Sequence, residues 1–207
     1  MKVLLVNGSP HQHGCTYMAL QETAKALEHQ GIHTEIFWIG VKPIAGCIGC
    51  GSCRKNGGKC FVQDAVNQFT ALAAEADGFV FGSPVHYAAI SGAMTSFMDR
   101  AFYSGGSVLA GKPAASVVSC RRGGASAAFD QMNKYFTINS MPVVSSQYWN
   151  QVHGSTPEQV LQDLEGLQTL RTLAGNMAWL LKCIEAGKAA GIERPAQEPV
   201  IRTNFIR

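Results

Sequence analysis

The chain has 207 residues, of which 46% are hydrophobic and 15% are charged, and its formal net charge is +3. This composition predicts one globular domain with a sizeable core and excludes a disordered chain. The net charge is small and the sequence contains no basic stripe with interleaved aromatic residues, so we expect no nucleic-acid partner. Because no signal-peptide pattern and no run of ~18 apolar residues is present, we expect a cytoplasmic protein without a membrane partner. Its seven cysteines should then be thiols, metal ligands or redox groups rather than disulfides.

Strand-like and helix-like segments alternate along the chain. Strands are expected at residues 3–6, 34–39, 78–81, 114–119 and 141–144. Helices are expected from Thr16 onward, near residues 64–75 with Asp64 as N-cap, from Ser91 to about residues 99–101, and from Thr156 for some seven turns. The last of these carries an apolar stripe from Leu161 to Ile184, which we interpret as core. The alternation predicts an α/β fold with a doubly wound parallel sheet.

Residues 7–16 connect the first strand to the first helix and have the pattern of an anion site. They open with N-G-S-P, which must turn the chain, and the N–H groups at the following helix N-terminus are unpaired and favour negative charge. Ser9 and Thr16 add hydroxyl donors, and His11 and His13 can add ring N–H donors. The spacing excludes the dinucleotide G-x-G-x-x-G and the triphosphate G-x-x-x-x-G-K-[ST] loops. We therefore expect a monophosphate here; a plain turn with Thr16 as a helix cap is the alternative.

This loop, with Gly14 and Thr16, resembles the G-S-P-R-x-x-G-N-T loop of flavodoxin-like NAD(P)H-dependent FMN reductases. In that family the loop holds the FMN 5′-phosphate, and the sheet order is 2-1-3-4-5. His11 stands where the family has Arg or Lys, and Cys15 stands where it has Asn, so phosphate binding is expected to be weaker or pH-dependent. The resemblance implies FMN as cofactor and a phosphate site formed by Ser9, His11, His13, Gly14, Cys15 and Thr16.

Two further loops at the carboxyl ends of the expected strands resemble the same family. Residues 82–92 resemble its S-P-x-Y-x-x-x-x-S-G pattern, which runs along the flavin ring, and the following helix contains its F-x-D-R. The third loop follows the fourth strand, and an Arg there can stabilise the negative edge of reduced flavin, meet an NADPH phosphate or be solvated. The resemblance implies ring and nucleotide contacts from Pro84, Val85, His86, Tyr87, Ser91, Ser119, Arg121, Arg122, Gly123 and Gly124.

Four cysteines between the second strand and the next helix have the spacing C-x2-C-x2-C-x6-C, at Cys47, Cys50, Cys53 and Cys60. Thiolates three residues apart on a Gly-rich loop can converge on one centre. Three alternatives stay open: a [4Fe–4S] cluster, a zinc ion, or free thiols near the flavin. The close spacing of the first three cysteines resembles that of ferredoxins and, more closely, that of the iron–sulfur flavoproteins of this fold. Of the remaining cysteines, Cys15 and Cys120 are expected near the ligand and Cys183 on or beside the apolar face of the last helix.

The resemblance implies an FMN-dependent oxidoreductase that takes hydride from NAD(P)H and passes electrons to a flavin, a quinone or an iron–sulfur acceptor. The flavin performs the chemistry, so we name no catalytic acid or base. One alternative is an electron carrier that passes electrons from FMN through [4Fe–4S] to a partner protein without oxidising NAD(P)H. Another is a redox-sensing module without turnover. Small carriers of this fold are typically shorter and acidic, so the length and the positive charge favour the enzyme.

Residues 188–207 are expected to be a tail outside the flavodoxin-like FMN-binding domain of residues 1–187. Pro195 and Pro199 prevent the preceding helix from continuing. Phe205 and Ile206 are apolar residues that a free tail does not need. We therefore expect a homodimer or homotetramer in which the tail is an arm on a partner subunit, with packing on its own subunit as the alternative.

Overall fold

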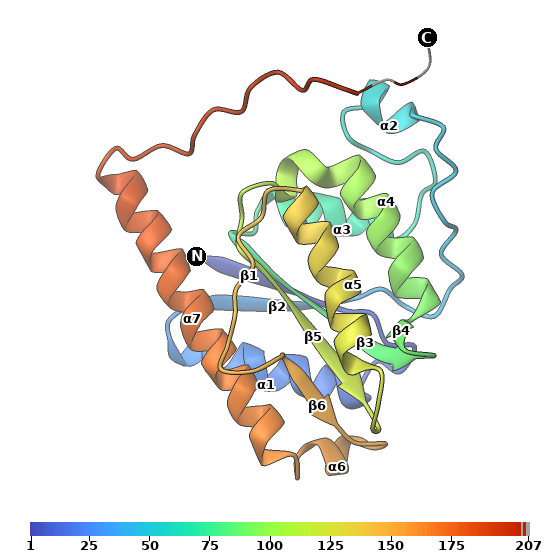
Figure 1. Cartoon of the computed structure of the whole chain (residues 1–207), viewed down its shortest axis with the longest axis vertical. Coiled ribbons are helices and arrows are strands. Elements are labelled where there is room, and N and C mark those ends of the chain that lie inside the picture. Colours follow the sequence, from blue (N-terminus) through green and yellow to red (C-terminus); the bar gives the residue numbers. More distant parts are fainter. Residues whose placement is uncertain (204, 206–207) are drawn as a thin grey trace.

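A parallel β-sheet occupies the centre of the molecule and has helices on both faces (Figure 1). The computed structural model describes residues 1–203 and 205. The sheet runs in the order β2-β1-β3-β5-β6, with the short β4 paired antiparallel to β3. The strands are β1 Lys2–Asn7, β2 His33–Trp38, β3 Gly78–His86, β4 Ala89–Ile90, β5 Ala114–Cys120 and β6 Gln151–His153. The five parallel strands have the predicted flavodoxin-like order, and β4 is an additional strand that was not predicted.

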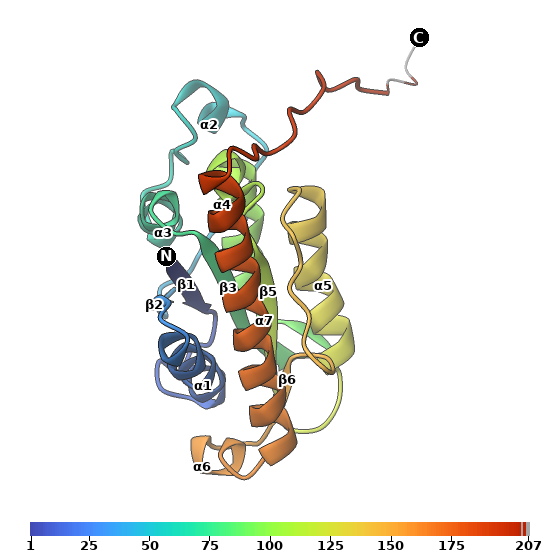
Figure 2. The ribbon, with the colours of Figure 1, turned by 90° about the vertical axis from the view of Figure 1, so that its left-hand side faces the viewer.

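Two layers of helices cover the sheet (Figure 2). On β1, Val3 and Leu5 pack with α1 and α7, whereas Leu4 and Val6 pack with α3, α4 and α5 on the opposite face. Successive strand residues point to opposite faces, so a strand covered on both sides is apolar throughout. The helices are α1 Cys15–His29, α2 Ser52–Lys55, α3 Ala65–Ala74, α4 Gly92–Leu109, α5 Ala125–Ile138, α6 Pro157–Val160 and α7 Leu164–Ala189. None of the helices in the described chain is long and apolar enough to cross a membrane.

The expected fifth strand was placed too early in the chain. Within residues 141–144, Val143 forms only an isolated parallel bridge to Ala114, and the edge strand is β6, which pairs with residues 118–120 of β5. Between these two contacts the chain leaves the sheet edge. The hydroxyl oxygen of Ser146 lies 2.6 Å from both the carbonyl oxygen of Tyr148 and the side-chain oxygen of Asn150, so its single proton is shared between them and holds a turn there.

The predicted boundaries of two helices were also wrong. The helix capped by Thr156 is only the short α6, because the Asp163 carboxylate accepts the N–H of Gly166 at 2.9 Å and starts a new helix, α7. Leu161 and Leu164 at this break are exposed. The stripe is buried as expected from Leu167 to Met177, but Leu180 and Ile184 at its end are only half-buried. The helix that begins after Ser91 does not stop near residues 99–101 but continues to the end of α4.

The tail begins against the base of the sheet and then leaves it. Ile192 donates its N–H to the carbonyl of Gly187 at 2.9 Å, and Arg194 donates to the carbonyl of Ala110 at 2.8 Å. Figures 1 and 2 show the following residues extending away from the body of the molecule. Phe205 is 90% exposed, and Ile206 lies outside the described residues. The division into a domain of residues 1–187 and a tail stays a prediction.

Candidate functional site

The turn between β1 and α1 is held by its own side chains. Asn7 Oδ1 accepts the N–H of Ser9 at 3.0 Å, and the Ser9 hydroxyl accepts the N–H of His11 at 3.1 Å. Asn7 Nδ2 donates to the carbonyl of Gln12 at 3.0 Å. Asn7 and Ser9 are both buried. These bonds leave the turn little freedom, so it is formed before any ligand arrives.

The N-terminus of α1 presents free donors at this turn. The helix begins at Cys15 after Gly14, and no side chain caps it. Among the described residues, no acceptor is found for the first-turn N–H groups of Cys15, Thr16 and Tyr17. His13 stands edge-on to the ring of Tyr17, with the ring centres 4.8 Å apart. Unpaired N–H groups and the positive end of a helix dipole are the features that bind phosphate.

Hydrogen bonds join this turn to the other two predicted loops. Thr16 and Ser119 share a buried bond of 2.8 Å between their hydroxyl oxygens. Ser91, the N-cap of α4, donates its hydroxyl to the carbonyl of Gly8 at 2.9 Å. Because the parallel strands β1, β3 and β5 end at the same edge of the sheet, all three loops meet there.

The second loop differs from its predicted form, because much of it is strand. β3 continues to His86, turns at Tyr87 and Ala88, and returns as β4. Both turn residues have positive φ, 50° and 60°, which costs energy for residues other than Gly. Pro84 and Val85 are half-buried, whereas His86 and Tyr87 are exposed at the tip. Strain of this kind persists where the surroundings impose it, as they do at ligand sites.

The third loop follows β5 and packs under this hairpin. Arg121, Arg122 and Gly123 are exposed. Gly124 has φ +85°, and a Cβ there would lie 2.7 Å from the Cα of Ala88, so only Gly fits. The side chains of Arg121 and Arg122 are therefore exposed to solvent, whereas the backbone of their loop packs against the hairpin at Gly124.

Two cysteines lie at this edge of the sheet. Cys15 donates its thiol to the carbonyl of Gly154 at 3.6 Å, and Cys120 is buried at the end of β5. Burial raises the pKa of both thiols, because it disfavours the charged form. The side chains of Cys15 and Cys120 are therefore uncharged thiols at this edge of the sheet. Cys183 lies on the last helix, α7, as expected, but its side chain is exposed and not part of the core.

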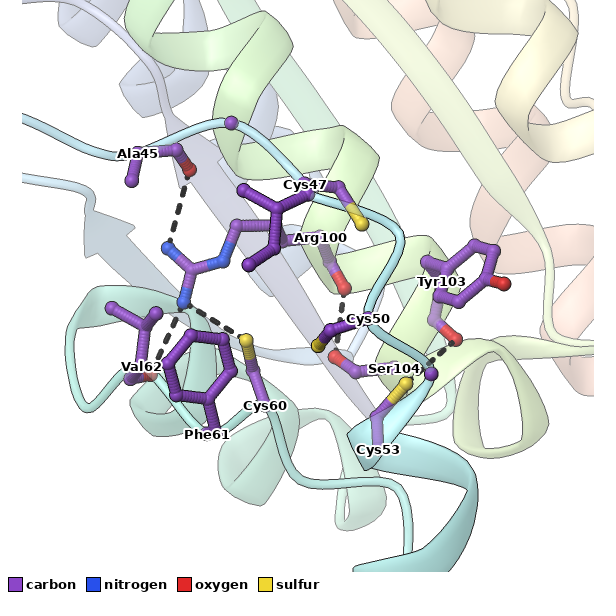
Figure 3. A pocket seen from close by; sticks show the side chains of 13 residues that line it. Ala45, Cys47, Cys50, Cys53, Cys60, Phe61, Val62, Arg100, Tyr103 and Ser104 are labelled. Carbon is purple, nitrogen blue, oxygen red and sulfur yellow. Dashed lines mark hydrogen bonds between the residues drawn. The ribbon is translucent and has the colours of Figure 1, made fainter.

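The four clustered cysteines line one cavity of about 170 Å³ (Figure 3). Cys47 and Cys50 are exposed, Cys60 is half-buried and Cys53 is buried on the short α2. A hydrogen bond from Ser52 lowers the pKa of Cys50. The cavity is otherwise almost entirely apolar, and Ile48, Phe61 and Tyr103 form its exposed rim.

The chemistry of this donor set fits an iron–sulfur cluster. Thiolates are the ligands of such clusters, and no carboxylate or imidazole lines the cavity with them. The thiols are not drawn together, however: the described residues contain no group of three or more Cys, His, Asp or Glu side chains arranged to hold a metal ion. The structure therefore brings the four predicted ligands to one cavity without forming a closed coordination site.

Sequence reasoning missed two side chains at these sites. Trp38 donates its indole N–H to the carbonyl of Ser9 at 2.8 Å; its position beside Asn7 follows from the register of two parallel strands. Arg100 is 2% exposed and lines the thiol cavity, although its motif was noted only as a family feature. The signal for Arg100 was available, because it shares a helix face with the apolar residues Phe97 and Ala101.

A family model described as NADPH-dependent FMN reductase matches residues 1–155. An iron–sulfur flavoprotein of Methanocaldococcus jannaschii is 33% identical over 193 residues, which cover 89% of this chain and 100% of that protein. One of Methanosarcina thermophila is 23% identical over 192 residues, covering 91% of this chain and 99% of that protein.

Solved structures show the same fold at low identity. RosB with a bound intermediate, 8-demethyl-8-formylriboflavin-5′-phosphate, matches with a TM-score of 0.71 and 16% identity, covering 99% of this chain and 92% of RosB. An archaeal flavodoxin matches with a TM-score of 0.59 and 16% identity, covering 88% of this chain and 99% of the flavodoxin.

Proposed function

Because the chain belongs to the NADPH-dependent FMN reductase family, we propose that it binds FMN, takes hydride from NAD(P)H and passes electrons to a flavin, quinone or iron–sulfur acceptor. The observation that carries this proposal is the convergence of three loops at the carboxyl edge of the sheet. There the buried hydroxyls of Thr16 and Ser119 meet beside the unpaired N–H groups of α1. A single preformed anion site with no second nucleotide fingerprint suits FMN rather than FAD.

The first loop would hold the 5′-phosphate. The first-turn N–H groups of Cys15, Thr16 and Tyr17 need acceptors, and the Ser9 and Thr16 hydroxyls are close to them in sequence. His11 and His13 are exposed at the rim and would add ring N–H donors. Neither side chain is a fixed cation like Arg, so hydrogen bonds rather than a permanent positive charge would hold the phosphate.

The second and third loops would hold the ring. Pro84 and Val85 would give apolar cover and backbone N–H or carbonyl groups to the ring edge, and Tyr87 stands free at the hairpin tip. Arg121 or Arg122 would stabilise the negative charge of the reduced ring or meet a nicotinamide nucleotide phosphate. Bound FMN supplies the hydride chemistry, whereas the protein binds, orients and shields it.

We further propose that the Cys47, Cys50, Cys53 and Cys60 thiolates bind a [4Fe–4S] cluster. The shared cavity and the all-sulfur donor set support this, as does the similarity of the chain to iron–sulfur flavoproteins. The loop would have to close around the cluster, which its glycines allow: Gly49, Gly51, Gly57 and Gly58 all have positive φ.

The same relatives support the second candidate function, an electron carrier that does not oxidise NAD(P)H. The two are separated by mixing anaerobic, FMN-loaded protein with NADH or NADPH. The enzyme predicts loss of the oxidised flavin band with a saturable rate. The carrier predicts that the band persists until a reduced partner protein or dithionite is added.

A homodimer or homotetramer is proposed for this protein in the cytoplasm. The apolar rim of the thiol cavity, formed by Ile48, Phe61 and Tyr103, supports an interface there. The exposed apolar residues Val200 and Ile201 of the tail support a second contact. The seven free cysteines suit a reducing compartment.

A further inference from the structure

Arg100 is a buried cation in the wall of the thiol cavity. It lies on α4, is 2% exposed and lines the cavity together with the four cysteines (Figure 3). A guanidinium has five N–H donors and stays charged in proteins. Its burial is tolerated only where surrounding groups compensate its charge and accept its hydrogen bonds. The partners of Arg100 therefore indicate what this side chain holds in place.

Two hydrogen bonds of Arg100 hold the backbone that frames the cysteine loop, and two more bind the side chain of Asp64. The Asp64 carboxylate accepts from both terminal nitrogens of Arg100, with Oδ1 at 3.0 Å from Nη2 and Oδ2 bonded to Nη1. The carbonyls of Ala45 and Val62 accept at 3.4 and 3.1 Å. Ala45 precedes the four cysteines and Val62 follows them, so one side chain ties both ends of the loop to α4.

Arg100 also donates directly to sulfur. Its Nη2 lies 3.3 Å from Sγ of Cys60. Cys53 makes the opposite kind of contact, because its thiol donates toward the carbonyl of Tyr103 at 4.0 Å. The sulfur of Cys60 is thus an acceptor for a charged donor, a contact that a cluster ligand can keep, whereas the Cys53 contact uses the thiol proton.

One donor of Arg100 has no partner. Its Nε is buried and makes no hydrogen bond within the described residues. A buried donor without an acceptor is costly and calls for an explanation. This nitrogen has almost no accessible surface, so an occupant of the open cavity does not reach it. Negative charge in the cavity is therefore indicated by the bond from Arg100 to the sulfur of Cys60.

We propose that Arg100 is a positioning residue for the iron–sulfur cluster, which holds the Cys60 ligand by a hydrogen bond. This inference rests on the proposed function, in which the four thiolates bind a cluster. Hydrogen bonds to cluster sulfur and a nearby positive charge favour the reduced, more negative state, and so raise the reduction potential. Arg54 and Lys55 are exposed near the same loop and are screened by solvent, whereas Arg100 is not.

Arg100→Lys tests this role. Lysine keeps the positive charge and can contact Asp64, but it lacks the planar guanidinium group that donates to Asp64 and Cys60 at the same time. We expect the variant to fold and to bind FMN as the wild type does. Its cluster midpoint potential, measured by anaerobic titration with electron paramagnetic resonance, should be lower. Iron loss to a chelator should be several-fold faster. The FMN potential in the same sample is the internal reference and should not move.

Asp64→Asn is the matched control. Asparagine still accepts the N–H of Val66, so α3 keeps its cap, and the donor to Cys60 remains. This variant should not lower the cluster potential. If Arg100→Lys leaves the cluster potential and iron loss unchanged in an iron-loaded protein, or shifts the FMN potential equally, the inference alone is overturned. If the wild type binds FMN but takes up no iron and sulfide on anaerobic reconstitution, both the inference and the proposed cluster are overturned.

A second measurement needs no change at Arg100. Protein carrying isotopically labelled arginine is prepared with Arg54→Lys, because Arg54 contacts Tyr103 on the cavity rim at 3.1 Å. Pulsed electron paramagnetic resonance of the reduced cluster should show a weak coupling to the labelled nitrogen. A reduced cluster without this coupling overturns the inference even if Arg100→Lys fails to fold.

Discussion

Thr16 and Ser119 are 103 positions apart in the sequence and share a buried hydrogen bond of 2.8 Å between their hydroxyl oxygens. Thr16 stands in the first turn of α1, and Ser119 near the end of β5. Each hydroxyl can accept one bond and donate another. One of the two protons is therefore available to an anion bound at this edge of the sheet. The predictions below start from this contact.

We predict that Ser9→Ala combined with Thr16→Val weakens FMN binding by a few kcal/mol, because each lost hydrogen bond to a charged phosphate is worth about 1.5–3 kcal/mol. Titration of apo-protein with FMN, followed by flavin fluorescence, measures the change. Ser107→Ala, at an exposed hydroxyl in the last turn of α4, is the control and should have wild-type affinity. Unchanged affinity in the double variant would place the phosphate elsewhere.

We predict about four irons per chain in protein purified anaerobically, with matching sulfide. Cys53→Ser should abolish iron binding but leave FMN bound, because the phosphate loop is a separate element. Cys183→Ser removes an exposed cysteine outside this cavity and should retain the iron. Elemental analysis measures the iron per chain, and flavin released on denaturation measures the bound FMN. Zinc in place of iron, or four titratable thiols in fresh anaerobic protein, would reject the cluster.

We predict that Gly124→Ala weakens FMN binding and lowers the free energy of unfolding by about 1–3 kcal/mol, since it adds a Cβ 2.7 Å from Ala88 at a positive φ. Gly123→Ala changes the neighbouring residue, where no atom lies within 4 Å of an added Cβ, and should be nearly neutral. Urea unfolding and FMN titration of both variants make the comparison. Equal effects would show that contact with the hairpin does not matter.

We predict that the full-length protein is a homodimer or larger and that a chain ending at Gln197 assembles less tightly. This truncation keeps the contacts of Ile192, Arg194 and Gln197 with the rest of the chain but removes the exposed Val200 and Ile201. Light scattering over a concentration series measures both chains. A full-length monomer would contradict the prediction. Two equally tight dimers would place the interface on the body of the molecule instead of the tail.

The sheet could be predicted from the sequence because its strands are buried on both faces. Runs such as residues 3–6 are apolar at every position, and only a central parallel strand requires that. The edge strand could not be placed, because Gln151–His153 is a short pairing whose position depends on the turn around Ser146. The break before α7 was missed for a similar reason: Asp163 acts as a cap inside a continuous apolar stripe.

The candidate site was predictable where it is local and missed where it depends on long-range contacts. Residues 7–16 contain their own turn and helix start, so they could be assigned to an anion site. Tyr87 and Ala88 have the positive φ values of a two-residue hairpin turn between β3 and β4, and neither is a residue such as Gly or Asn that would have marked this turn in the sequence. The contact of Arg100 with Cys60 joins α4 to the cysteine loop, across 40 positions of the sequence.

Anaerobic stopped-flow mixing of FMN-loaded protein with NADPH, and separately with NADH, tests the central claim most directly. We predict that at least one nucleotide removes the oxidised flavin absorbance at a rate that saturates with its concentration, and that added quinone or free flavin restores the band. If neither nucleotide reduces the bound FMN while dithionite does, the protein is not an NAD(P)H-dependent reductase, and the claim is wrong.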